Sequence, residues 1–228
     1  MASVDTHQPL QALRALPKRS STAEHAAQKL RRHIAHGKLL PGTQLREEAV
    51  SAAFGLSRNT VREAFRLLAH ERLLEHALHR GVFVRTLTAA DVRNIYVTRR
   101  LVQPLGIDAA LRDPSCLTAL DECVDTAIAA ADNGDWDTVG TADIDFHRTL
   151  VAGCGSSHIT AMFEHVLAEL RLAFLQMPDR RLLHKPYIEG NWQIAALLGD
   201  GDRAGALAAM RVYLDAAERH VLGALSRG

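Results

Sequence analysis

The chain has 228 residues, of which 47% are hydrophobic and 23% charged. This length allows one large domain or two small ones, and the composition excludes an intrinsically disordered chain. No apolar run approaches the roughly 18 residues that a membrane-spanning helix needs, and the first 19 residues are polar, without a signal-peptide core. We therefore expect a cytoplasmic protein without a membrane partner. The three cysteines include no Cys-x-x-Cys pair for zinc or redox chemistry.

The formal net charge of +1 hides a strong asymmetry along the chain. Residues 1–86 contain 14 Lys and Arg against 7 Asp and Glu, a net charge of +7, whereas residues 87–228 contain 13 against 19, a net charge of −6. A concentrated basic segment is typical of a domain that binds a polyanion such as DNA. We expect a flexible polar tail over residues 1–21, a basic DNA-binding domain over 22–86 and an acidic domain with another role over 88–228.

The basic segment contains helical patterns separated by short turns. Apolar residues recur with helical spacing and predict a first helix over 23–36. A second helix is predicted over 47–54, ended by Gly55, and a third over 58–71, for which Ser57 is a candidate N-cap. Two helices that meet across a tight glycine-containing turn indicate a helix-turn-helix.

The period changes to two residues after the third helix. Alternate positions from Leu74 to Leu78 face Val82 and Val84 across a turn at residues 79–81. This pattern predicts a β-hairpin, or wing, behind the helix-turn-helix.

The pattern of apolar residues predicts helices along the whole acidic segment. Apolar residues return every three or four positions, and Gly, Pro and Asn residues interrupt the pattern. Short connections predict antiparallel packing in a bundle. The expected helices cover residues 88–112, 115–133, 136–153, 157–177, 182–198 and 201–226. The predicted fold is mainly α: an N-terminal winged helix-turn-helix with a small β-hairpin, followed by an all-α bundle of about six helices.

The start of the third helix concentrates side chains that suit DNA recognition. An apolar stripe through Val61 and Phe65 faces inward and leaves Ser57, Arg58, Asn59 and Arg62 exposed. Arginine can bridge the O6 and N7 acceptors of guanine, asparagine can pair with adenine, and a hydroxyl at a helix start can bind phosphate. This end of the helix is the part that a recognition helix inserts into the major groove.

The basic segment resembles the winged-helix domain of GntR-family bacterial transcription regulators. The resemblance covers about 60 residues and rests on the turn glycines, the run from Gly55 to Ala64 and the segment Arg80 to Val84. It implies a homodimer on a palindromic double-stranded operator. Where the family often has Glu-Arg, this chain has Glu47-Glu48, and we expect Arg46 to supply that contact. The resemblance implies DNA contacts by Ser57, Arg58, Asn59, Thr60 and Arg62, and by a wing tip at Arg80 and Gly81.

The acidic segment is similar to the FCD ligand-binding domain of the FadR-like members of this family. The similarity rests on the stretch from Tyr96 to Pro104, in which Gln103 replaces a family Glu, and on Asp143-Ile144-Asp145-Phe146-His147. Asp143 and His147 are four residues apart and share one helical face, where two side chains can hold one ion or one polar ligand.

Metal-binding members of the family have two further histidines in the last two helices. Counting from Gly201-Asp202 and from Met210 places Asn191 and Tyr213 at those positions. Both are poor ligands for zinc or nickel, so a divalent metal at Asp143 and His147 is disfavoured and no cofactor is assigned. We expect instead a polar effector cavity in which Arg99 binds a carboxylate. Its predicted lining is Arg99, Gln103, Asp143, His147, Asn191 and Tyr213.

Three functions compete at this level. The first is a transcription regulator, expected to be a repressor, whose operator affinity responds to a small organic acid or related metabolite in the helical domain. The second is a ligand-independent DNA-binding protein. The third is a hydrolase or lyase that uses His147 with Asp143, although the sequence contains no nucleophile elbow or phosphate loop and this function would leave the basic segment unexplained.

Overall fold

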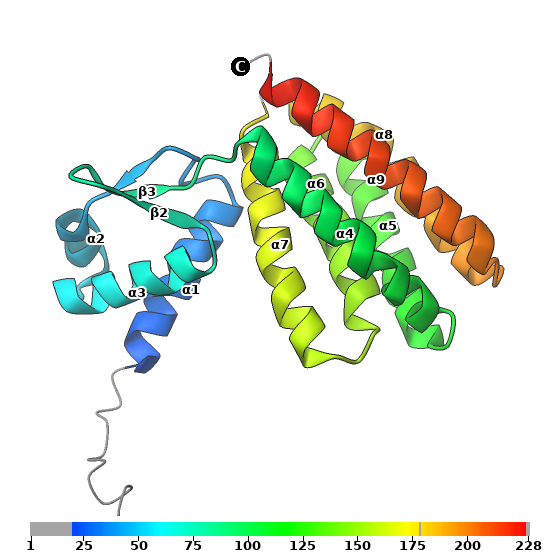
Figure 1. Ribbon diagram of the computed structural model, residues 1–228, viewed down its shortest axis with the longest axis horizontal. Helices are drawn as coiled ribbons and strands as arrows, with labels where there is room; N and C mark the ends of the chain where they lie inside the picture. The colour runs from blue at the N-terminus through cyan, green and yellow to red at the C-terminus, as the bar shows by residue number, and fades with distance from the viewer. Residues whose placement is uncertain (1–19, 178, 227–228) are drawn as a thin grey trace, which may run out of the picture.

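The computed structural model describes residues 20–177 and 179–226 and has two domains joined near residue 87 (Figure 1). The tail predicted over residues 1–21 lies, as far as residue 19, outside the described residues. None of the helices within the described ranges is long and apolar enough to span a membrane.

The N-terminal domain is a winged helix-turn-helix. Its three strands form an antiparallel sheet in the order β1-β3-β2. The predicted hairpin is confirmed, with Leu74 opposite Val84 in the register. The hairpin pattern was wrong at Leu78, because β2 ends one residue earlier and this side chain is exposed. The elements are α1 (Ser20–Ala35), β1 (Gln44–Leu45), α2 (Glu47–Phe54), α3 (Arg58–His70), β2 (Leu74–Ala77) and β3 (Gly81–Val84).

Local sequence signals position α3 against the rest of this domain. Gly55 adopts a positive φ of 64° and ends α2. The hydroxyl of Ser57 then accepts a hydrogen bond from the backbone N–H of Thr60 and caps α3. The buried face of α3 packs on α1, so its opposite face is free for contact with another molecule. The buried residues of α3 are Val61, Ala64, Phe65 and Leu68.

The C-terminal domain is a bundle of six helices within the described residues, which confirms the predicted fold class. Helix starts are fixed by caps, among them a reciprocal capping box between Thr88 and Asp91 at the start of α4. The helices are α4 (Ala89–Ala110), α5 (Pro114–Asp132), α6 (Trp136–Ala152), α7 (Ser157–Leu175), α8 (Arg180–Gly199) and α9 (Arg203–Leu225).

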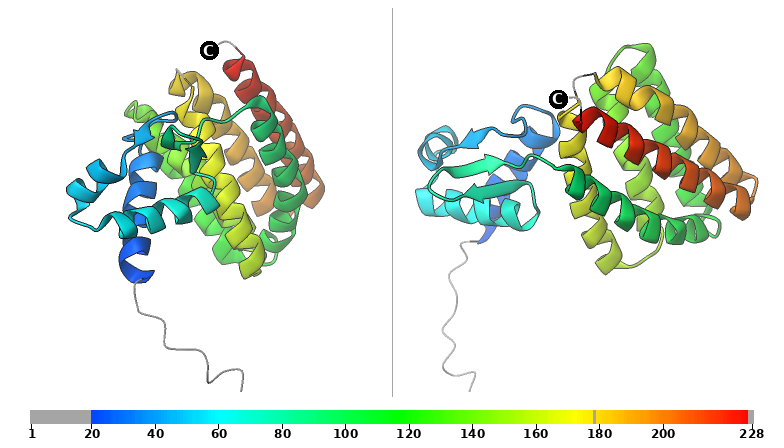
Figure 2. Two further views of the ribbon diagram at one scale, coloured as in Figure 1. Left: turned by 60° about the vertical axis from the view of Figure 1, so that its left-hand side comes forward. Right: turned by 45° about the horizontal axis from the view of Figure 1, so that its top comes forward.

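Helix α7 is the element of the bundle that lies against the N-terminal domain (Figures 1 and 2). Arg171 donates from Nε to the carbonyl oxygen of Ala35, at the end of α1, at 2.7 Å. The side-chain amide of Gln176 accepts from the backbone N–H of Leu87 at 2.6 Å and donates to its carbonyl oxygen at 3.1 Å. The buried carboxylate of Glu169 pairs with Arg85 at 2.6 Å. These contacts hold α7 against the C-terminal end of α1 and the segment that follows β3.

Candidate nucleic-acid interface and buried polar cavity

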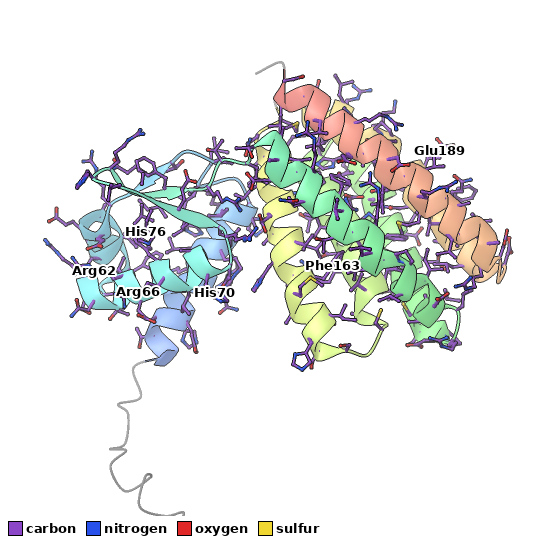
Figure 3. The ribbon with its side chains drawn as sticks, viewed as in Figure 1. Arg62, Arg66, His70, His76, Phe163 and Glu189 are labelled. Atoms are coloured by element: carbon purple, nitrogen blue, oxygen red, sulfur yellow. The ribbon has the colours of Figure 1, made fainter. Side chains whose placement is uncertain are left out.

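The exposed end of α3 lies on the side of the N-terminal domain that is turned away from the bundle. Figure 3 shows Arg62 and Arg66 on this outer part of α3, whereas His70 lies nearer the bundle. Arg58, Asn59 and Arg62 are exposed, and the hydroxyls of Ser57 and Thr60 lie 2.8 Å apart at the helix start. The five predicted side chains on α3 therefore form one surface. Arg46, the N-cap residue of α2, is also exposed.

Two glutamates of α2 pair with the arginines of α3. Arg62 donates from Nε to both carboxylate oxygens of Glu47, at 2.8 and 2.9 Å. Arg58 donates from Nη2 to Glu48 at 2.6 Å. The hydrogen bond to Glu47 raises the pKa of Arg62, so this guanidinium stays charged.

The wing tip is held in a conformation that favours glycine. Gly81 has a φ of 104°, and the side-chain amide of Gln44 donates to the carbonyl oxygen of Arg80 at 2.7 Å. The Arg80 guanidinium lies 5.6 Å from the centroid of the Phe83 ring, a cation–π distance, and remains exposed. A cation is thus presented at the end of the β2-β3 hairpin.

The second candidate site lies inside the bundle and is centred on Asp143. The Tyr213 hydroxyl donates to Asp143 Oδ1 at 2.6 Å, and the Asn191 side-chain amide donates to the same oxygen at 2.9 Å. His147 Nε2 lies 3.9 Å from this oxygen, and its ring centroid lies 5.1 Å from that of Tyr213. The structure thus brings together four of the six predicted residues, and both Asp143 and His147 are buried.

The remaining two predicted residues are buried on α4. Arg99 is 1% exposed, and its guanidinium carbon lies 5.0 Å from the Tyr96 ring centroid. Arg99 lines a cavity of about 10 Å³ together with Asp143, the volume of roughly one water molecule. Tyr213 also lines this cavity, whereas Gln103, His147 and Asn191 are buried but do not line it.

Several buried polar atoms in this region have no hydrogen-bond partner among the described residues. Burying a polar group without a partner costs roughly 1–3 kcal/mol. Of the residues that carry these atoms, Tyr96, Arg99 and His184 line the cavity, which makes it a candidate site for a polar ligand. The atoms are Nε and Nη2 of Arg99, both amide atoms of Gln103, both ring nitrogens of His147, Nδ1 of His184, Oδ1 of Asn191 and the hydroxyl of Tyr96.

Burial sets the protonation states here. Burial, helped by the charge of Arg99, lowers the pKa of His147 to about 3. Burial also lowers the pKa of His184 to about 4, against the opposing charge of Asp143. Burial alone would raise the pKa of Asp143, yet this pKa is lowered, because His147, His184, the Tyr213 hydroxyl and Arg99 stabilise the carboxylate. Since both imidazoles are neutral at pH 7, the hydrogen bonds from Tyr213 and Asn191 and the charge of Arg99 stabilise the carboxylate there.

Three polar residues of the cavity, Tyr96, His184 and Tyr187, were not predicted from the sequence. A signal for two of them was present, because His184, Tyr187 and Asn191 follow one another on α8 at spacings of three and four residues and share one face.

Comparison with protein-family models gives two matches. Residues 22–84 match the model of bacterial regulatory proteins of the gntR family, and residues 94–216 match that of the FCD domain. The chain belongs to the GntR family and carries an FCD domain. It is a DNA-binding transcription regulator.

Individual GntR relatives agree with this assignment. A GntR transcriptional regulator from Rhodococcus sp. RHA1 has a crystal structure that superposes with a TM-score of 0.85 at 39% identity, over 90% of this chain and 99% of that one. The regulator YdhC of Bacillus subtilis is 32% identical over 60% of this chain, and the match spans 62% of YdhC, less than two thirds of its length. The gluconate operon transcriptional repressor of Bacillus licheniformis is 28% identical over 74% of this chain and 70% of its own.

The GntR and FCD matches decide against the enzyme hypothesis, because these domains and relatives are regulators. The metal chemistry of some family members does not fit the residues present. Asp143 is surrounded by an amide and a phenol in addition to His147, and no group of three or more His, Cys, Asp or Glu side chains in the described part of the chain is arranged to hold a metal ion.

Proposed function

We propose that this GntR regulator is a cytoplasmic homodimeric repressor that binds a palindromic operator and responds to a small organic acid in its FCD domain. The observation that carries the DNA-binding part is the exposed polar end of α3, beside a wing tip that presents a cation. In this proposal Ser57, Arg58, Asn59, Thr60 and Arg62 enter the major groove, and Arg46, Arg80 and Gly81 contact the flanking backbone and minor groove. The repressor assignment follows the name of the gluconate operon relative.

The experiment is a titration at fixed salt with a duplex that the wild-type chain selects from a random-sequence pool. Arg58→Ala and Arg62→Ala should each weaken binding about 5- to 150-fold, because a lost base contact costs roughly 1–3 kcal/mol. Arg203→Ala is the control, since it removes the same charge from an exposed ion pair in the bundle. Unchanged affinity of both α3 variants would remove the proposed role of this helix.

An exposed apolar face on α4 supports the homodimer. Val97, Leu101 and Leu105 lie four residues apart, and Leu101 is 71% exposed. The ion pairs Arg100–Asp215 and Asp108–Arg203 connect α4 with α9 and show that the two helices are antiparallel, which places the exposed Val212 of α9 near the level of this stripe. We infer that a second copy of the chain covers this apolar face. One winged helix reads only a few base pairs, whereas two copies related by a two-fold axis read a palindrome.

The effector part of the proposal rests on Arg99. A fully buried guanidinium with unpaired Nε and Nη2 offers the two parallel donors that a carboxylate accepts. The cavity holds about one water molecule, so an organic acid needs additional space. Helix α8 can supply it, because the segment around Leu183 and Tyr187 covers the cavity and Pro186 interrupts the helical hydrogen bonding there. In this proposal the rest of the ligand is oriented by Gln103, Asp143, His147, Asn191 and Tyr213.

Helix α7 connects the cavity to the winged helix. Phe174 lines the cavity, and its ring contacts that of His184 at a centroid distance of 4.9 Å. Arg171 of the same helix donates to the backbone of α1, and Gln176, the residue after its last turn, binds the backbone of Leu87 between the domains. A ligand that displaces Phe174 would therefore shift the contacts that orient the winged helix. In this way the effector would change the affinity for the operator.

A further inference from the structure

The glutamates of α2 engage the two recognition arginines through different nitrogen atoms. Glu47 accepts twice from Nε of Arg62, the nitrogen nearest the side-chain stem. Glu48 accepts from Nη2 of Arg58, one of the two terminal nitrogens. A guanidinium reads guanine with two parallel N–H donors, so it matters which nitrogens are already occupied.

The pairing with Glu47 leaves the outer edge of Arg62 available. In the described structure no ion pair or hydrogen bond involves Nη1 or Nη2 of Arg62. The side chains of Arg62 and Glu47 are 54% and 31% exposed, so the carboxylate of this pair is less hydrated than that of a fully exposed pair. Glu47 thus limits the rotamers of Arg62 and leaves both terminal nitrogens of Arg62 without a partner among the described residues.

The pairing with Glu48 has the opposite consequence for Arg58. The bond uses a terminal nitrogen, and the side chains of Arg58 and Glu48 are 60% and 73% exposed. Such an exposed pair is weak and screened by salt. DNA must break this bond before Arg58 can present both terminal nitrogens, and the Glu48 carboxylate adds negative charge to a surface that approaches phosphates.

We propose that the two adjacent glutamates tune DNA recognition in opposite directions. Glu47 is a positioning residue that holds Arg62 ready to read a base and so raises sequence specificity. Glu48 competes with DNA for Arg58 and lowers affinity for every sequence. This inference rests on the proposed insertion of α3 into the major groove.

The test uses full-length Glu47→Gln and Glu48→Gln chains with the selected duplex and a scrambled duplex of equal composition, at fixed salt. Glu63→Gln is the matched control, because it removes the same charge from α3, where Glu63 pairs with Arg66 instead. Glu47→Gln should reduce the ratio of selected to scrambled affinity by about 5-fold or more, the low end of a lost base contact. Glu48→Gln should tighten binding to both duplexes by about 1.5- to 5-fold, the range of an exposed ion pair. Unchanged circular dichroism and melting temperature confirm that each variant folds.

Double-mutant cycles separate positioning from a general charge effect. In an Arg62→Ala background, Glu47→Gln should no longer change the ratio of selected to scrambled affinity. In an Arg58→Ala background, Glu48→Gln should change DNA affinity no more than Glu63→Gln does. An unchanged ratio for Glu47→Gln, or an equal gain for Glu48→Gln and Glu63→Gln, overturns the corresponding half of the inference. If the arginine variants themselves bind the selected duplex normally, the proposed role of α3 fails instead.

Discussion

Replacing Arg99 by methionine separates the buried charge from the packing at the effector cavity. Methionine keeps an unbranched apolar stem on α4 but removes the guanidinium, which has two unpaired nitrogens at the cavity. A ligand present at 100 times its Kd stabilises the native state by about 2.7 kcal/mol. For a chain of this size each kcal/mol raises the melting temperature by about 2–4 °C, so a bound carboxylate should raise it by about 5–11 °C in the wild type.

The assay is a thermal melt against a panel of small carboxylates, each beside its neutral amide. The wild type and an Arg203→Met control, which loses an exposed guanidinium on α9, should respond to the same acid and not to its amide. Arg99→Met should lose the response, measured against its own ligand-free melting temperature. Arg99→Lys, which keeps the charge without the planar fork, should retain only part of it. An equal shift in Arg99→Met would refute the carboxylate role of Arg99, and no shift with any acid would favour ligand-independent DNA binding.

Three further predictions concern pH, assembly and metal. The pKa values of His147 and His184 are lowered to about 3 and about 4, so the unfolded chain binds more protons than the native chain below pH 6.5. The free energy of unfolding should therefore fall by a few kcal/mol between pH 6.5 and pH 4. Denaturant midpoints that do not change across this range would contradict the buried neutral imidazoles. Leu101→Asp should convert a dimer to a monomer in sedimentation, whereas Leu182→Asp, at a comparably exposed leucine of α8, should not; a persistent Leu101→Asp dimer would exclude the α4 face. Purified protein should contain far less than one zinc, nickel or manganese ion per chain and melt unchanged with a chelator; a stoichiometric metal that Asp143→Asn releases would reverse this expectation.

The helices could be predicted because their ends carry local chemical signals. Gly55 ends α2 and Ser57 caps α3 at the predicted residues. Strand β1 was missed because two residues, Gln44 and Leu45, are too few to show a period, and only the pairing with Val82 and Phe83 defines them as a strand. Short-range patterns thus located the long helices but not an element whose partner is distant in sequence.

Cavity residues on distant helices could be predicted only where the residue spacing known from the family pointed to them. That spacing led to Asn191 and Tyr213, which the structure brings to Asp143 from two other helices. His184 was passed over because a single histidine on a helix carries no ligand spacing of its own. Its spacing from Tyr187 and Asn191 indicates a shared face of α8, but only the packing of α8 on α6 places that face beside Asp143.

The most direct test of an effector-controlled regulator is the affinity of the full chain for its selected duplex with and without the carboxylate that raises its melting temperature. The coupling between two ligand sites is typically about 1–3 kcal/mol. We therefore predict that a saturating carboxylate weakens operator binding by about 5-fold or more in the wild type and leaves the Arg99→Met variant unaffected. The same operator Kd for the wild type with and without saturating carboxylate would contradict the account.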